Sequence, residues 1–297
     1  MATKDHWFPA ILLVLSCAAS MRAQEPEDVI RTNTNLVTIN VSVNGNKGQP
    51  VAGLRQENFL VTEQEKQMRV EFFDNSGPTS IVFVVDLSSS MRGPKWQSLK
   101  AAMKEFLAKA PSGNDYTLIG FGDSPSVIAR SANEDQLWQA LNMLVPYGNT
   151  ALYDAVLVGL NELTQIPHRH KALVLFSDGE DTSSRAVLSA VGQEVVMRRA
   201  TIYTVGILSS YDSPLPDGRT GQELLKELAA ASGGIAYFPA AGGIRQVLTE
   251  IRSDLSGQYS LSYYPLENSP GRRRVQVRIM QTEQIASLRY QQYYTIK

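Results

Sequence analysis

Near its N-terminus the chain alternates apolar and polar residues. Val37, Ile39, Val41 and Val43 are apolar and are separated by single polar residues, a period of two that is typical of a strand with one buried face. Shorter extended runs are predicted at residues 59–62 and 68–73. Residues 31–74 therefore predict a small antiparallel β unit, and residues 75–78, Asn-Ser-Gly-Pro, predict a linker after it.

From residue 80 the strands become apolar along their whole length and alternate with helical stretches. Strands buried on both faces are predicted at residues 81–85, 116–121, 172–176, 202–207 and 235–238. Helices are predicted near residues 95–110, 134–144, 151–165, 184–199, 221–231 and 244–255. This alternation indicates an α/β fold with a doubly wound, mostly parallel sheet that has helices on both faces.

After residue 256 the pattern returns to short strands. Residues 258–264 and 275–280 predict a hairpin around a loop at residues 268–271, so the run Arg272-Arg273-Arg274 is interpreted as its solvated turn. Residues 288–296 predict one more strand. Because an isolated hairpin is only marginally stable in water, we expect these strands to pair with residues 36–73 in a small antiparallel sheet or sandwich.

The first residues predict an export signal. Lys4 precedes an apolar run from Trp7 to Cys17, which is too short to span a bilayer and ends among small residues. Cleavage is expected after Ala23, with a site near Ala18 as the alternative. The residues around Cys17 also resemble a loose bacterial lipobox, in which case a lipid on Cys17 would be the membrane attachment. We therefore expect an exported protein of the periplasm, the cell envelope or the extracellular space.

Four segments follow from these patterns: a signal peptide at 1–23, an N-terminal β segment at 24–78, an α/β domain at 79–256 and a C-terminal β segment at 257–297. The 297 residues are 43% hydrophobic, which is enough for a sizeable core. Lys and Arg (28) nearly balance Asp and Glu (29), so no bulk basic charge would attract nucleic acid.

The cysteine content limits the metal chemistry. One cysteine cannot form an internal disulfide, and together with His168 and His170 it cannot complete a structural zinc site. Both histidines are expected at the surface. Any metal ion would therefore be held by oxygen ligands.

Carboxylates and hydroxyls follow two of the predicted parallel strands. Asp86, Ser88 and Ser90 come directly after the 81–85 strand, Asp178 follows the 172–176 strand, and Thr150 opens the helix between them. Parallel α/β sheets bind ligands outside the carboxyl ends of their strands. We therefore expect these five side chains to gather at one edge of the sheet.

These five positions carry a family resemblance. Residues 80–256, with the pattern Asp-x-Ser-x-Ser at 86–90, Thr150 and Asp178, resemble the von Willebrand factor A (VWA), or integrin I-like, domain and its metal-ion-dependent adhesion site (MIDAS). The resemblance implies a Rossmann-like core in which the Ser88, Ser90 and Thr150 hydroxyls contact the ion. It further implies that Asp86 and Asp178 act largely through water or orient the hydroxyls.

The β segments on either side resemble a narrower group. Residues 51–73 and 258–265 are similar to flanks found in a bacterial secreted group of VWA-related proteins, best known from acidobacteria. This similarity implies an exported protein with short β segments on both sides of the VWA domain.

Oxygen ligands of this kind suit Mg²⁺, with Mn²⁺ as the alternative ion. Because hydroxyls are neutral, the ion would retain much of its charge and would attract an anionic oxygen, such as an Asp or Glu carboxylate of a protein partner. The expected function is a non-enzymatic, exported module for protein binding or adhesion.

Plainer interpretations remain for the separate pieces. Ser88 and Ser90 could cap the helix that begins near Pro94, Thr150 could be a helix N-cap, and residues 178–179 could form an ordinary turn. The chain would then be a structural scaffold without metal. Asp154 is expected at most to support the ligands from behind.

Other function classes lack the residues that they need. No G-x-S-x-G elbow stands near a strand end, as a serine hydrolase would require. Enzymes that form an aspartyl phosphate have a second Asp where this chain has Ser88. An intracellular adaptor subunit of an ATPase-type complex is the remaining alternative, and the export signal argues against it.

Overall fold

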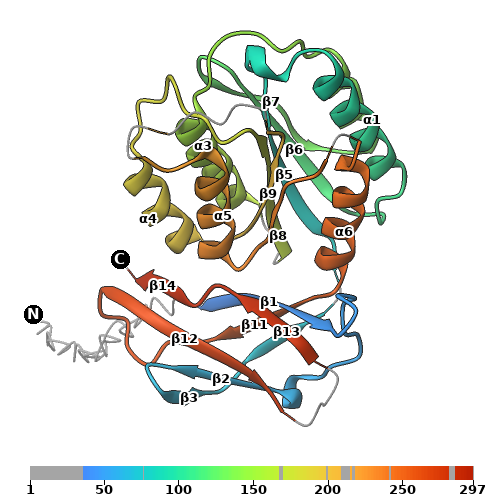
Figure 1. Ribbon diagram of the computed structural model, residues 1–297. Coiled ribbons are helices and arrows are strands. Elements are labelled where there is room, and N and C mark those ends of the chain that lie inside the picture. Colours follow the sequence, from blue (N-terminus) through green and yellow to red (C-terminus); the bar gives the residue numbers. More distant parts are fainter. Residues whose placement is uncertain are drawn as a thin grey trace, which may run out of the picture. The chain divides into compact units, whose positions relative to one another are not determined.

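The sheet at the centre of the α/β domain has six strands in the order β10-β9-β8-β5-β6-β7 (Figure 1). Its strands are β5 (Thr79–Asp86), β6 (Asp115–Phe121), β7 (Pro125–Ala132), β8 (His170–Ser177), β9 (Thr201–Gly206) and β10 (Ala236–Tyr237). All neighbours pair in parallel except β6 and β7, which are antiparallel. The prediction of a mostly parallel α/β sheet is confirmed. Strand β7 was not predicted, because most of its residues alternate between partly and fully exposed and it has no continuous apolar run.

The computed structural model describes residues 36–75, 77–166, 170–198, 200–208, 215, 218–240, 242–280 and 285–296. The predicted signal peptide, Cys17 and His168 lie outside the described residues. Among the described residues, no helix has both the length and the apolar character needed to cross a membrane.

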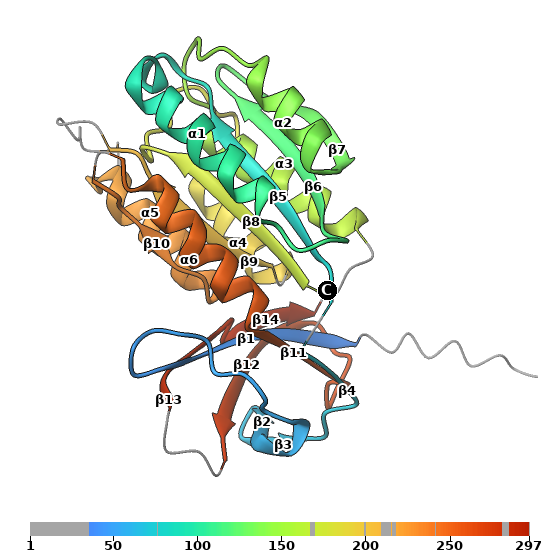
Figure 2. The ribbon, with the colours of Figure 1, turned by 90° about the vertical axis from the view of Figure 1, so that its right-hand side faces the viewer.

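Helices cover both faces of the sheet (Figure 2). They are α1 (Pro94–Ala108), α2 (Glu134–Asn142), α3 (Leu152–Gln165), α4 (Leu188–Arg198), α5 (Gly221–Ser232) and α6 (Ile244–Ser256). Helices α1, α2 and α6 pack on one face, around Phe83 and Phe176 of the sheet. Helices α3, α4 and α5 pack on the other face, around Val84 and Leu173. Alternate residues of each central strand thus point into different cores, which explains the continuous apolar runs.

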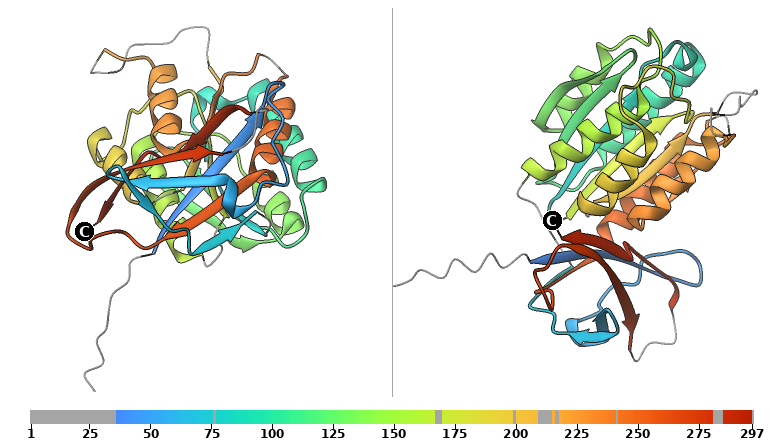
Figure 3. Two further views of the ribbon diagram at one scale, coloured as in Figure 1. Left: turned by 90° about the horizontal axis from the view of Figure 1, so that it is seen from below. Right: turned by 90° about the vertical axis from the view of Figure 1, so that its left-hand side faces the viewer.

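Both ends of the chain contribute to a β-sandwich (Figure 3). Its two sheets have four strands each, in the orders β13-β1-β11-β4 and β14-β12-β2-β3. The strands are β1 (Val37–Gly45), β2 (Phe59–Glu63), β3 (Lys66–Met68), β4 (Phe72–Asp74), β11 (Gln258–Tyr263), β12 (Gly271–Ile279), β13 (Ile285–Tyr290) and β14 (Tyr293–Ile296). A 3₁₀ turn, η1 (Gln56–Asn58), precedes β2. Strand β1 pairs with β11 and β13, and β2 pairs with β12. The predicted pairing of the two terminal segments is confirmed.

The connections inside the sandwich differ from the prediction. Strands β11 and β12 lie in different sheets and do not form a hairpin, and residues 288–296 contribute to two strands, β13 and β14, in different sheets. The arginine run 272–274 lies within β12, not in a turn, and the Arg272 guanidinium lies 4.1 Å from the centre of the Tyr293 ring. A period of two reveals which face of a strand is buried, but it does not identify the neighbouring strand.

The prediction that His170 lies at the surface is also wrong. His170 is the first residue of β8 and is 4% exposed. Its Nε2 lies 3.7 Å from Oδ2 of Asp74, the last residue of β4. Strand β8 lies between β5 and β9 in the sheet, so even its first residue is covered.

A buried polar cluster joins helix α6 to the sandwich, and both belong to one unit, Thr34–Lys297. Asp254 of α6 accepts hydrogen bonds from Ser42 Oγ, Tyr203 OH and Arg289 Nη2. Gln258 Nε2 donates to Tyr203 OH at 2.9 Å and to Ser42 Oγ at 3.2 Å. We call Ser42, Tyr203, Asp254, Gln258 and Arg289 the base cluster. Burial and the Asp254 charge raise the pKa of Tyr203 well above its usual value, so its hydroxyl stays protonated and donates.

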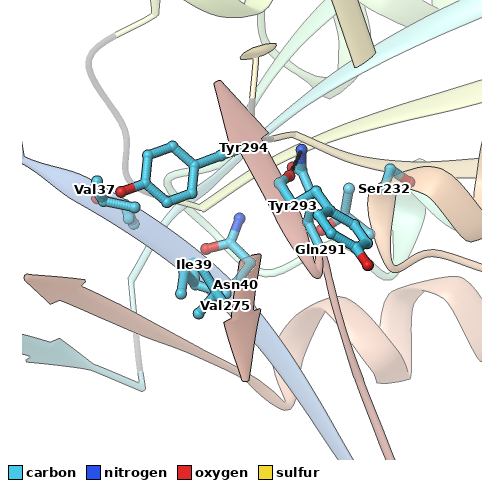
Figure 4. Close-up of a pocket in the computed structure, with 10 residues that line it drawn as sticks. Val37, Ile39, Asn40, Ser232, Val275, Gln291, Tyr293 and Tyr294 are labelled. Carbon is cyan, nitrogen blue, oxygen red and sulfur yellow. Dashed lines mark hydrogen bonds between the residues drawn. The ribbon is translucent and has the colours of Figure 1, made fainter. Parts of the chain in front are cut away.

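Figure 4 shows a cavity lined by residues of both the sandwich and the α/β domain, where Gln291 and Tyr293 approach Ser232. Its volume of about 10 Å³ is sufficient for roughly one water molecule. Gln291 Nε2 already donates to Val196 O at 2.7 Å and to Tyr293 O at 2.8 Å. The cavity is therefore a packing feature of the junction and is too small for a ligand.

Candidate metal centre

Asp86 is the last residue of β5 and its side chain is fully buried. Its Oδ1 accepts a hydrogen bond from Ser88 N at 2.7 Å, and its Oδ2 accepts one from Ser177 Oγ at 3.0 Å. Ser177 is the last residue of β8, which pairs in parallel with β5. The two strands therefore bring their final polar residues together at one edge of the sheet.

The hydroxyls of Ser88 and Ser90 link this carboxylate to the next one. Ser88 Oγ and Ser90 Oγ lie 3.0 Å apart, and Ser90 Oγ donates to Asp178 Oδ2 at 2.9 Å. Neither hydroxyl caps a helix: the 3₁₀ turn η2 (Ser89–Met91) has no side-chain cap bond, and the N-cap of α1 is Gly93. The capping interpretation of these serines is thus wrong.

Asp178 follows β8 and is 4% exposed. Its Oδ1 accepts from Glu180 N at 3.2 Å, while Gly179 turns the chain with a φ of +87°. A Cβ at Gly179 would lie 2.4 Å from Gly221 O, so only glycine fits between Asp178 and the start of α5. Residues 178–179 therefore do form a turn, and that turn holds the carboxylate against Ser90.

The Thr150 segment is joined to both of these loops. Thr150 N donates to Thr182 Oγ1 at 3.0 Å, and Thr150 O accepts from Thr182 N at 2.8 Å. On the other side, Ser89 N donates to Gly148 O at 3.1 Å. The N-cap of α3 is Ala151, so Thr150 is not a cap. Thr150 is 6% exposed, and its hydroxyl makes no hydrogen bond to another described residue.

The centre contains negative charge that the described part of the chain does not neutralise. Neither Asp86 nor Asp178 forms an ion pair with any Lys, Arg or His whose placement the structure describes. Burial, and to a smaller extent the charge of Asp178, raises the pKa of Asp86 to about 6. Burying the ionised Asp86 carboxylate next to Asp178 is therefore unfavourable unless a cation compensates its charge.

The donor set fits a hard divalent cation. It offers the hydroxyls of Ser88, Ser90 and Thr150 with the carboxylates of Asp86 and Asp178, all of them oxygen ligands of the type that Mg²⁺ prefers. Within the described residues there is no group of three or more His, Cys, Asp or Glu side chains that could hold a metal. A cation at this edge would thus depend on hydroxyls and water as well as on the two carboxylates.

Sequence reasoning missed the residues that hold the loops in place. Ser177, which also accepts from Gly179 N at 3.1 Å, could have been recognised as the one polar residue at the end of a buried apolar strand. Thr182 gave no comparable signal. Asp154, in contrast, was expected at most to support the ligands from behind: it accepts from Arg185 N at 3.0 Å and from Ala186 N at 2.9 Å and so fixes the loop behind them.

Comparison with known sequences matches the von Willebrand factor type A domain to residues 81–180. Heavy chain H1 of the inter-alpha-trypsin inhibitor from Sus scrofa is 27% identical over 143 residues, which are 43% of this chain and 16% of that protein. Heavy chain H2 from Homo sapiens is 26% identical over 175 residues, 54% of this chain and 18% of that protein. The chain therefore spans less than a fifth of these curated relatives.

Solved structures share the fold at low sequence identity. A von Willebrand factor type A protein from Catenulispora acidiphila is 14% identical, with a TM-score of 0.54 over 90% of this chain and 74% of that one. Proximal thread matrix protein 1 from the mussel byssus, solved with a zinc-occupied MIDAS motif, is 17% identical, with a TM-score of 0.51 over 64% of this chain and 48% of that one. The sequence match and the shared architecture together support a von Willebrand factor type A domain in this chain, matched by the family model over residues 81–180.

Proposed function

We propose that this protein is a binding module that captures an acidic group of a protein partner through a divalent ion, and that it catalyses no reaction of its own. The ion, Mg²⁺ or alternatively Mn²⁺, would be held by the candidate centre, which consists of Asp86, Ser88, Ser90, Thr150 and Asp178. The observation that carries the proposal is the pair of buried carboxylates, bonded to hydroxyls and lacking an ion pair among the described residues.

The roles of the side chains follow from their contacts. Asp86 holds the backbone of Ser88, and Asp178 orients the Ser90 hydroxyl, so the carboxylates arrange the neutral ligands while supplying the negative charge. The Thr150 hydroxyl, which has no other described partner, is available as a third neutral ligand. A bound divalent ion with neutral ligands would supply the positive charge that attracts a carboxylate from outside.

Two relatives are compatible with this function. The mussel byssus protein was solved with zinc at its MIDAS motif, which is the kind of site proposed here. The inter-alpha-trypsin inhibitor proteins are by name heavy chains of an inhibitor. By analogy, we propose an interaction or adhesion role for this chain.

We further propose that the protein is exported, as the apolar run from Trp7 to Cys17 and the similarity of its flanks to a secreted bacterial group suggest. Cleavage would release the chain, whereas lipidation of Cys17 would attach it to a membrane. A cytoplasmic location would instead favour the ATPase-adaptor alternative.

Isothermal titration of the chelator-treated full chain with Mg²⁺ tests the ion site. We expect saturable binding that is weakened at least tenfold in Asp178→Ala and unchanged in Asp135→Ala, a control carboxylate in the first turn of α2. Absence of binding in the wild type would leave the structural scaffold as the function.

A capture experiment tests the partner half of the proposal. Wild-type chain immobilised in Mg²⁺ should retain envelope proteins that a chelator releases and that Asp178→Ala does not retain. Retention that is independent of both the chelator and Asp178 would contradict capture through an ion.

A further inference from the structure

The loop that follows α2, residues 143–147, lies beside the candidate metal centre and carries large apolar side chains on its outer side. Met143, Val145 and Tyr147 are 83%, 76% and 70% exposed, whereas Leu144 and Pro146 between them are partly or fully buried. The inward side chains account for the packing of the segment, since Leu144 contacts the core on the α1 face. The outward ones make no contribution to that core.

Backbone contacts fix this segment against the loop of the metal centre. Tyr147 N donates to Leu87 O, between Asp86 and Ser88, and Arg92 Nε donates to Pro146 O at 3.0 Å. Gly122, which directly follows β6, packs against the same segment: a Cβ at Gly122 would lie 2.7 Å from Tyr147 O. The backbone of Tyr147 is therefore closely packed. These contacts fix the backbone that carries the exposed side chains of Val145 and Tyr147.

A single exposed apolar residue needs no explanation, but three on alternate positions of a fixed segment indicate a contact surface. We call Val145 and Tyr147, the two nearest to the centre in sequence, the apolar rim. Tyr147 is followed by Gly148, whose carbonyl bonds Ser89 N, so the rim is continuous with the loops that carry Ser88, Ser90 and Thr150.

We infer that the apolar rim is the second half of the partner site, and that the partner is a protein segment with an acidic residue flanked by a large apolar residue. This inference rests on the proposed function, because the ion would supply the charge that binds the acidic group. The neighbouring apolar side chain would pack on Val145 and Tyr147, where an aromatic ring offers a large contact area. A small carboxylate such as acetate would use the ion alone and would gain nothing from the rim.

The chain itself offers an alternative occupant, which the test must separate. Leu266 is 45% exposed and stands beside Glu267, whose side chain is 69% exposed, so a second copy carries the same chemistry. Glu267 Oε2, however, already accepts from Ser269 Oγ at 3.3 Å and lies 3.9 Å from Arg273 Nη2. Glu267 of a second copy would have to give up these contacts in order to bind the ion. A separate protein whose carboxylate makes no such contacts is therefore the favoured partner.

The test uses fluorescent hexapeptides with a central Asp or Glu and with Leu, Phe or Ser beside it, titrated with the full chain in Mg²⁺. In the wild type, Leu- or Phe-flanked peptides should bind about tenfold more tightly than Ser-flanked ones. Tyr147→Ser should remove that preference. Tyr264→Ser, a control at a 43% exposed tyrosine that follows β11 of the sandwich, should retain it.

Parallel Mg²⁺ titration of each variant separates the two proposals. If the wild type binds Mg²⁺ but binds the Leu-, Phe- and Ser-flanked peptides equally, or binds no peptide, the role of the apolar rim in partner binding is wrong. The ion site would then still stand. If the wild type does not bind Mg²⁺, the proposed function itself is wrong. Mg²⁺-dependent dimers in sedimentation, absent in Tyr147→Ser, would identify a second copy as the occupant and overturn the separate partner.

Discussion

The molecule contains two clusters of carboxylates and hydroxyls that differ in one respect. In the base cluster, Asp254 accepts from two hydroxyls and is paired with Arg289, so the protein supplies the cation itself. In the candidate metal centre, Asp86 and Asp178 accept from hydroxyls and backbone N–H groups, and no ion pair with a described residue balances them. The comparison teaches that similar residue types form a structural joint when their charge is neutralised internally, and that without this neutralisation their charge is left for a cation from outside.

The largest effect is expected from breaking the charge balance of the base cluster. Asp254→Ala would leave Arg289 without its carboxylate and Tyr203 without its acceptor, which should lower the free energy of unfolding by about 3 to 4 kcal/mol. Urea denaturation measures this loss. A loss below about 1 kcal/mol would show that the cluster does not hold the junction.

The unbalanced charge of the metal centre should appear in the pH dependence of stability without metal. The pKa of Asp86 is about 6 in the folded protein against 3.8 as its reference, so the folded state binds the extra proton between these values. The contribution of Asp86 to the free energy of unfolding should therefore be largest below pH 4. It should fall by about 2 to 3 kcal/mol as the pH rises to about 6.

Urea denaturation from pH 4 to pH 7 in chelator measures this slope. The variant Asp86→Asn should lack it, because an amide does not titrate, and saturating Mg²⁺ should compensate the charge above pH 6. Equal slopes in the wild type and in Asp86→Asn would contradict the assignment to Asp86.

A smaller effect is expected from the serine that supports Asp86. Ser177→Ala would remove the hydrogen bond to Asp86 Oδ2 and leave Gly179 N without its acceptor, which should lower the free energy of unfolding by about 1 kcal/mol. Ser126→Ala, at an exposed serine of β7, is the matched control and should change it by less than about 0.5 kcal/mol. Equal effects of the two substitutions would show that Ser177 does not support the centre.

How far the sequence predicted this molecule depends on the kind of signal. The buried parallel strands were predictable because continuous apolar runs such as 81–85 and 172–176 are specific to strands covered on both faces. Asp86, Ser88, Ser90 and Asp178 could be proposed as ligands because they closely follow those runs, whereas Thr150 was proposed because it opens the helix between them. In both cases the information lies within a few neighbouring residues.

What the sequence missed depends on contacts between distant segments. The placement of β11 and β12 in different sheets is decided by partners more than 200 residues away in β1 and β2, which local alternation does not encode. The base cluster likewise draws Ser42 and Asp254 together across 212 positions. The exposure of Val145 and Tyr147 likewise becomes evident only once the neighbouring residues are packed.

The most direct test of the central claim is scanning calorimetry of the chelator-treated full chain, with and without millimolar Mg²⁺. An ion that binds only the folded state stabilises it by RT ln(1 + [L]/Kd), so the Tm of the wild type should rise, with a smaller rise in Ca²⁺. Asp178→Ala should lose the shift while keeping its fold in chelator, whereas Ser42→Ala, in the base cluster, should keep the shift from a lower starting Tm. A wild-type Tm that does not respond to Mg²⁺ or Mn²⁺, or an equal response in Asp178→Ala, would contradict the account.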